Sequence, residues 1–96
     1  MYGLIERITT LSGQRDQLAG ILTSLDSMPG CLSYIVANDP SAPDVLWVTE
    51  TWENTSAHTD SLQLPHIQRA MQAGGPLIAN FERIAETDPV GGLGLG

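Results

Sequence analysis

The sequence predicts an α+β fold of the ferredoxin-like βαββαβ kind, with four strands in one antiparallel sheet. Two observations support this prediction. Four segments carry apolar and β-branched residues at alternating positions, as strands do. Apolar residues at helical spacing lie between the first and second segments, and helix-start and helix-stop residues lie between the third and fourth. This order of elements places helices on one face of the sheet.

The first strand is expected over residues 2–10, where both faces are partly apolar. A strand of this kind needs cover on both sides, so we expect helices on one side and a second subunit on the other. The helix that follows is predicted to begin after Ser12, whose hydroxyl can accept a hydrogen bond from a backbone amide at the helix start. Its apolar stripe comprises Leu18, Ile21, Leu22 and Leu25. Met28-Pro29-Gly30 is expected to end it, because proline cannot continue the hydrogen-bond ladder.

Residues 31–38 and 45–52 are the expected second and third strands. The segment DPSAPD between them is rich in turn residues, which favours an antiparallel pair. The stretch from Val45 to His58 then passes from a strand that carries indoles to a helix start that carries a histidine. Any small-molecule pocket in a chain this short should contact this stretch.

Asn54 and Thr55 are suited to cap a helix over residues 56–62. Pro65 is tolerated in the first turn of a further helical segment, and Gly74-Gly75-Pro76 is expected to end that segment.

Residues 81–87 are the expected fourth strand, and residues 91–96 form a glycine-rich tail. No internal repeat or linker divides the sequence, so we expect one domain over residues 1–96. A domain of this size buries a modest core, and oligomerisation is a common way to bury more.

Charge and composition exclude several partners. The net charge is −7, with four arginines and no lysine, whereas nucleic acids and anionic membranes attract clusters of cations. The single cysteine, Cys31, cannot form an internal disulfide, which is compatible with a reducing compartment. No signal peptide and no apolar segment of membrane-spanning length is evident, so we expect a cytoplasmic protein.

Four segments are familiar from one protein family: MPGCLSY at residues 28–34, WVTETW at 47–52, Ala57-His58, and PVGG at 89–92. On these segments the chain resembles the antibiotic biosynthesis monooxygenase family, including its quinol monooxygenase-like members. The resemblance implies a homodimer whose sheets pack into a barrel-like centre, and a cleft between sheet and helices in each subunit. It also implies oxidation of a phenolic, quinol or anthrone-type aromatic by dioxygen without a cofactor.

Haem-degrading monooxygenases share this fold and can be compared by position. The haem branch carries a tryptophan after the third strand and a haem-ligating histidine about ten residues later, as the resemblance implies. Aligned on Trp52, the chain has Ser61 and Met71 near those positions, and neither can serve the same role. His66 lies off that register, so haem binding is disfavoured.

Cofactor-free oxygenation requires a base, a few hydrogen-bonding groups and a dry pocket with aromatic walls. His58 is the first candidate for the proton acceptor, because histidine titrates near neutral pH; the plainer alternative is a histidine that packs at a helix start. His66 is expected to be solvated. The two histidines are eight residues apart with a proline between them, which is not the helical spacing of a metal pair.

Tyr34, Trp47 and Trp52 are candidates for substrate binding, with core packing as the plainer alternative for each. The tryptophans are five residues apart and therefore point to opposite faces of one strand, so one could line the cleft while the other packs at the subunit interface. The hydroxyl of Tyr34 could bond a substrate oxygen.

Glu6 and Glu50 are strand carboxylates with apolar neighbours. We interpret them as members of a structural ion pair across the dimer, and the candidate partners are Arg7, Arg69 and Arg83. Cys31 is interpreted as an inert buried thiol.

The resemblance, together with the absence of any cofactor motif in the sequence, thus favours a dimeric, cofactor-free monooxygenase that acts on a small aromatic substrate and dioxygen. Two alternatives stay open: a non-redox isomerase or cyclase that acts on a small carbonyl compound, and a ligand-binding dimer without catalysis.

Overall fold

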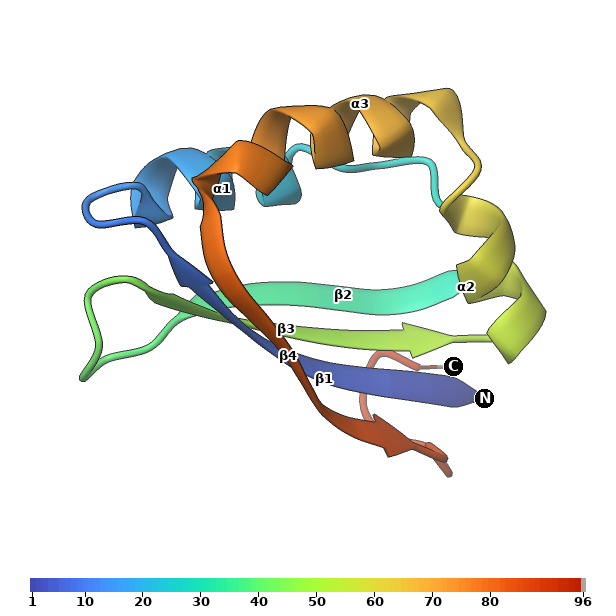
Figure 1. Ribbon diagram of the computed structural model, residues 1–96. Coiled ribbons are helices and arrows are strands. Elements are labelled where there is room, and N and C mark those ends of the chain that lie inside the picture. Colours follow the sequence, from blue (N-terminus) through green and yellow to red (C-terminus); the bar gives the residue numbers. More distant parts are fainter. Residues whose placement is uncertain (96) are drawn as a thin grey trace.

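The computed structural model describes residues 1–95, and Gly96, the end of the predicted tail, lies outside the described residues. The four strands form one antiparallel sheet in the order β2-β3-β1-β4. This arrangement confirms the predicted ferredoxin-like α+β fold, with a second short helix before the last one (Figure 1). The elements in chain order are β1 (Tyr2–Thr10), α1 (Arg15–Thr23), β2 (Cys31–Asn38), β3 (Val45–Trp52), α2 (Thr55–Ser61), α3 (Pro65–Gly74), a 3₁₀ turn (Gly75–Leu77) and β4 (Ile78–Thr87).

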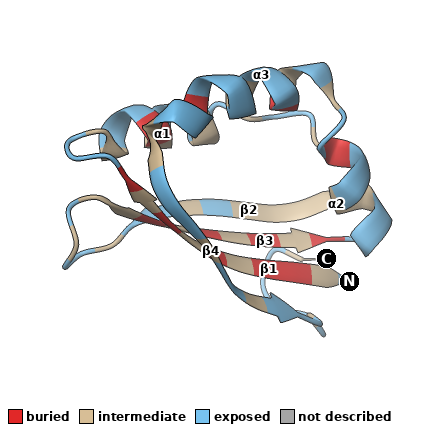
Figure 2. Ribbon diagram, viewed as in Figure 1, coloured by how far each residue is buried: buried red, intermediate tan, exposed pale blue. Residues whose placement is uncertain are grey.

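All helices lie on one face of the sheet, which we call the helix-side face; the other is the open face (Figure 1). Burial alternates along the two central strands, β1 and β3, because successive side chains of a strand point to opposite faces. Figure 2 shows this burial concentrated in the middle of the sheet and on the inner side of the helices. The core cluster consists of Ile8, Leu18, Leu46 and Val48. No helix within residues 1–95 is long and apolar enough to cross a membrane.

The first helix is shorter than predicted at both ends. It begins at Arg15 with Gln14 at the N-cap position and no side-chain cap bond, so the prediction that Ser12 caps it is wrong. It ends at Thr23, because the hydroxyl of Ser24 bonds back to the carbonyl of Ile21 at 2.7 Å and competes with continuation of the ladder. The segment from Ser24 to Pro29 is therefore an irregular connection that leads to β2.

Gly30 begins the return into the sheet with a φ of +82°, a conformation that side chains disfavour. A Cβ atom here would also lie 2.6 Å from the Cβ of Ala57. Glycine thus allows the start of β2 to pack directly against α2.

Asn54 caps α2 as predicted, since its side-chain oxygen accepts a hydrogen bond from the amide of Ala57 at 2.8 Å. Pro65 occupies the first turn of α3, also as predicted. The fourth strand begins at Ile78 rather than at Phe81, because the 3₁₀ turn leads directly into pairing between Ile78 and Thr10.

Candidate functional site

A cavity of about 370 Å³ lies between the helix-side face and the helices. Its floor is formed by side chains of all four strands. Its walls come from α1, α2, α3 and the connection that carries Leu25 and Met28. Most of the lining is apolar, and its polar groups are few: Glu6, Tyr34, Glu50, His58, Ser61 and Arg83. A mainly apolar pocket with a few convergent polar groups is typical of a small-molecule site.

Trp52 organises one end of this cavity and is only 1% exposed. Its indole N–H donates to Oε1 of Glu50 at 3.1 Å. Its ring also meets the ring of His58 edge-on, with 5.3 Å between the centroids. Glu50 and His58 are therefore linked through one buried indole.

His58 lies on α2, where the Asn54 cap fixes the start of the helix. Its ring lies between Trp52 and Tyr2, whose ring centroid is 5.8 Å away. Within residues 1–95, neither ring nitrogen has a hydrogen-bond partner from the protein, although the residue is half-buried and lines the cavity. The imidazole is therefore held by contacts with two aromatic rings, while its nitrogens stay available to a ligand.

Tyr34 lies on β2 directly opposite Glu50 of β3 and also lines the cavity. Burial raises the pKa of its hydroxyl, and the nearby charges of Glu50 and Glu6 raise it further. The phenol therefore stays neutral and can donate a hydrogen bond to a ligand.

Glu6 and Glu50 occupy the cavity floor, where they are 6% and 9% exposed. Both belong to the helix-side face, so the interpretation that they form an ion pair across a sheet-to-sheet dimer is wrong. The nearest cation is Arg83, whose Nη2 lies 3.9 Å from Oε2 of Glu6. Burial is the main cause that raises the pKa of Glu6 to about 8, and a hydrogen bond with Glu50 adds to it.

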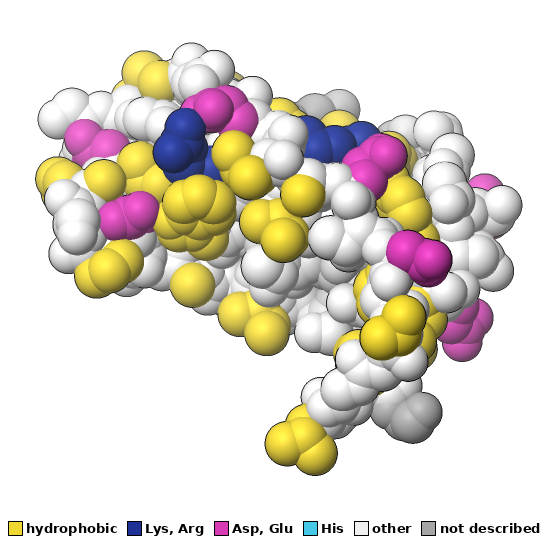
Figure 3. All heavy atoms as spheres, turned by 90° about the horizontal axis from the view of Figure 1, so that it is seen from below, with side chains coloured by type: hydrophobic (Ala, Val, Ile, Leu, Met, Phe, Trp, Pro, Cys, Tyr) yellow, Lys and Arg dark blue, Asp and Glu magenta, His cyan; other side chains and the backbone are white. Residues whose placement is uncertain are grey.

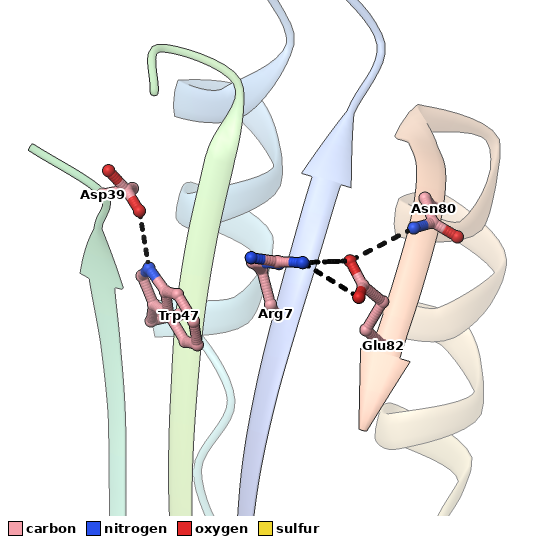
Figure 4. Close-up of polar contacts among 5 residues, drawn as sticks. All are labelled: Arg7, Asp39, Trp47, Asn80 and Glu82. Carbon is pink, nitrogen blue, oxygen red and sulfur yellow. Dashed lines mark hydrogen bonds and ion pairs between the residues drawn. The ribbon is translucent and has the colours of Figure 1, made fainter. Parts of the chain in front are cut away.

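Trp47 takes no part in this cavity, because it lies on the open face as the five-residue spacing to Trp52 requires. Its indole donates to Asp39 at 2.8 Å, and the guanidinium of Arg7 lies over its ring at 5.6 Å. Arg7 in turn binds both carboxylate oxygens of Glu82, at 2.8 and 2.9 Å. Figure 4 shows these contacts as one row across the sheet.

His66 and Cys31 lie outside the cavity lining. The Nε2 atom of His66 is 2.8 Å from the carbonyl oxygen of Asp26, which ties the start of α3 to the connection after α1. Burial raises the pKa of the Cys31 thiol, which lowers its thiolate fraction and agrees with an inert role. In the part of the chain that the structure describes, no three His, Cys, Asp or Glu side chains are grouped as metal ligands.

Three of the residues named from the sequence, Tyr34, Trp52 and His58, line this one cavity, and their roles stay predictions. The sequence also singled out Glu6 and Glu50, but it assigned them to an ion pair and not to the cavity lining. The alternation along each strand could have placed the two glutamates in the cavity. Glu6 lies between Leu4 and Ile8 on the buried face of β1. Glu50 stands in the same way between Val48 and Trp52.

The family model for antibiotic biosynthesis monooxygenases matches residues 1–73 of the chain. The chain belongs to the antibiotic biosynthesis monooxygenase family. Among curated proteins, none matches it. Family membership confirms the resemblance inferred from the four short segments.

Solved structures of related proteins agree with this membership. A candidate antibiotic biosynthesis monooxygenase from Chloroflexus aurantiacus J-10-fl is 51% identical, with 99% of this chain and 98% of that chain covered and a TM-score of 0.95. A candidate family member from Deinococcus radiodurans is 22% identical over 97% of this chain and 96% of that one, with a TM-score of 0.76. One from Caulobacter crescentus CB15 is 19% identical over 94% and 90%, with a TM-score of 0.80. The last two likenesses show the fold alone.

Proposed function

We propose that the protein is a monooxygenase that oxidises a phenolic, quinol or anthrone-type aromatic with dioxygen and without a bound cofactor. The single observation that carries this proposal is the position of His58. Its imidazole stands against Trp52 in a mostly apolar cavity, and within residues 1–95 its nitrogens have no protein partner. Such a group is suited to take a proton from a bound aromatic ligand.

The chemistry proceeds through the substrate anion. His58 accepts the proton of a ring hydroxyl or of an activated carbon, and the resulting anion gives one electron to dioxygen. The two radicals combine to form a C–O bond, and the protonated His58 returns its proton to the peroxide anion to give a hydroperoxide. The carbon that carries the hydroperoxide then loses its hydrogen as a proton and the O–O bond breaks, so that one oxygen atom remains as a carbonyl group and the other leaves as water. The apolar walls keep bulk water away from the anion.

The same proposal includes a homodimer that forms through the open face. Seen from below, this face shows many apolar side chains (Figure 3). Ile35, which is 56% exposed, and the half-exposed Trp47 belong to it. Two of its charged contacts are made within the face, since Arg7 binds Glu82 and the carboxylate of Asp39 accepts the indole N–H of Trp47. Burial of the face would therefore leave few charges without partners.

A non-redox isomerisation is the second candidate, and one observation favours it. The cavity holds an imidazole and two carboxyl groups, linked through Trp52, and groups of this kind can move a proton without an oxidant. This activity would not require dioxygen.

Oxygen dependence distinguishes the two candidates. Purified protein is assayed with a panel of quinols and anthrones in air and under argon, with the uncatalysed rate subtracted. We expect turnover with oxygen uptake in air and none under argon, and we expect His58→Gln to lower kcat by about 100-fold or more. His66→Gln is the matched control, because it removes a histidine at another helix start outside the cavity. Turnover under argon would support isomerisation, and full activity in His58→Gln would contradict the role of His58.

A further inference from the structure

Two buried carboxyl groups have no part in the oxygenation chemistry described above. Glu6 of β1 and Glu50 of β3 lie on adjacent strands, where Leu4 pairs with Glu50 and Glu6 pairs with Val48. The two glutamates are therefore diagonal neighbours on the helix-side face, and both line the cavity. Buried carboxylates normally have a cation or several donors, and here two carboxyl groups lie beside one partly exposed arginine, Arg83, at the limit of ion-pair distance.

The charge partner of this pair is weakly placed. Arg83 is the nearest cation at 3.9 Å from Glu6, its side chain is 42% exposed, and it also contacts Glu86 at 3.4 Å. Glu50 accepts the indole N–H of Trp52 at 3.1 Å. The pKa of Glu6 is raised to about 8 by burial and by its hydrogen bond with Glu50. The carboxyl group of Glu6 is therefore largely protonated at neutral pH.

We propose that this carboxyl pair binds an oxygen atom of the ligand, and that it makes the cavity select uncharged hydroxyl- or keto-bearing aromatics over carboxylates and phosphates. The proposal deepens the proposed function by naming the charge class of its substrate. It rests on that function only in treating the bound ligand as the substrate.

The pair offers complementary contacts to a neutral ligand. The protonated carboxyl of Glu6 can donate to a keto or phenol oxygen, and a carboxyl oxygen of Glu50 can accept a phenol O–H. An anionic ligand would instead lie against two carboxyl groups, and the arginine that lines the cavity, Arg83, is already engaged by Glu6 and Glu86. Trp52 lies between this pair and His58, so a flat ligand that reaches both ends would contact the indole.

Binding is tested directly, without turnover, by isothermal titration calorimetry with 1-naphthol and 1-naphthoate at pH 6.5. The two probes share one ring system and differ in charge. We expect wild-type protein to bind 1-naphthol at least about tenfold more tightly than 1-naphthoate, because only the acid is ionised at this pH. Equal binding of the two probes would overturn the proposal.

Two variants locate the selectivity. Glu50→Gln keeps an oxygen for the indole N–H of Trp52 but removes the charge, so we expect 1-naphthoate to gain about tenfold in affinity relative to 1-naphthol. Glu6→Gln keeps a hydrogen-bond donor, so 1-naphthol binding should persist at pH 6.5. In wild-type protein we expect this binding to weaken between pH 6 and pH 8 as Glu6 loses its proton, and in Glu6→Gln we expect no such change. Glu53→Gln is the matched control, because Glu53 is an exposed carboxylate outside the cavity lining.

Other titratable or charged groups also lie near the pair, namely Tyr34, Cys31, His58 and Arg83. They are present both in wild-type protein and in Glu6→Gln, so the difference between the two pH profiles reports the effect of Glu6. An unchanged probe ratio in Glu50→Gln, or an unchanged pH profile in Glu6→Gln, would contradict the proposal.

Failure of the two proposals gives different results. If naphthol selectivity and its loss in Glu50→Gln are seen but no oxygen is consumed with any substrate, the carboxyl pair stands and the oxygenase function fails. If oxygen is consumed but the probe ratio is the same in wild-type protein and in both glutamine variants, only the carboxyl proposal fails.

Discussion

On the helix-side face, Trp52 donates its indole N–H to Glu50 at 3.1 Å; on the open face, Trp47 donates to Asp39 at 2.8 Å. The two contacts are chemically alike, but their surroundings differ. Asp39 lies at the protein surface, where the bond from Trp47 and backbone amides lower its pKa. Glu50 lies in the cavity beside a second buried carboxyl group. The same donor therefore binds a carboxylate near the protein surface on one face and a buried carboxyl group that lines a cavity on the other.

The ion pairs differ in the same way. Arg7 donates to both carboxylate oxygens of Glu82, and the two side chains are 39% and 37% exposed. The side chain of Glu6 is 9% exposed, yet Arg83 comes no closer than 3.9 Å. The partly exposed ion pair on the open face is therefore short, whereas the buried carboxyl group on the helix-side face has a more distant cation. Because burial without pairing favours the protonated acid, the sheet separates a structural surface from a surface suited to proton chemistry.

The largest expected effect comes from the tryptophans. Trp52→Ala should lower the free energy of unfolding by about 4 kcal/mol, because a fully buried indole and its contacts are lost. Trp47→Ala should lower it by roughly 1 kcal/mol in the monomer, because that ring is partly exposed. Urea unfolding followed by circular dichroism measures both, with protein concentration varied to detect association. Equal losses at low concentration would mean that the two faces are not distinguished by burial.

The next effect depends on pH and compares Glu6→Gln with Glu82→Gln. The raised pKa of Glu6 means that the folded state holds this proton more tightly than the unfolded chain, whose glutamates titrate near pH 4.3. The resulting stabilisation is complete below about pH 4 and is lost as the pH rises through about 8. Wild-type protein should therefore lose about 3 kcal/mol relative to Glu6→Gln between pH 5 and pH 7.5.

Glu82→Gln carries the same change on the open face and provides the control. Its pair with Arg7 is partly exposed, so the loss of stability should stay below about 1 kcal/mol. The difference from wild-type protein should vary little over the same pH range. If the free energy of unfolding depended on pH in the same way in wild-type protein and in Glu6→Gln, the pKa of Glu6 would not be raised in the folded state.

The fold could be predicted from the sequence because its signals are local. Alternation marks the strands, and the Asn54 cap and Pro65 mark helix starts that the structure confirms. Ser12 failed as a cap because a capping residue type does not reveal which residue begins the helix; the chain there enters a turn at Gly13, with a φ of +76°.

The site could be predicted only in part, because its decisive contacts join residues that are distant in sequence. His58 and Trp52 were found together since one short stretch carries both. Glu6 and Glu50 lie close together because of the register between β1 and β3, which a local sequence pattern does not reveal. The sequence likewise did not decide which face of the sheet meets the helices, and that choice separates Trp52, which lines the cavity, from Trp47, which does not.

The smallest expected effect tests whether the open face is an interface. If a second copy covers it, Ile35→Asp should place a charge in the buried centre and raise the dissociation constant of the dimer at least about tenfold, equivalent to about 1.4 kcal/mol. Sedimentation equilibrium at several concentrations measures this constant, and Gln68→Asp on the exposed surface of α3 is the control. The cavity lies on the other face, so 1-naphthol binding per subunit should be unchanged in Ile35→Asp. If wild-type protein were a monomer at every concentration, the open face would not be an interface. Arg7, Trp47 and Glu82 would then form a surface network within one subunit, and the two faces would differ in their exposure to solvent.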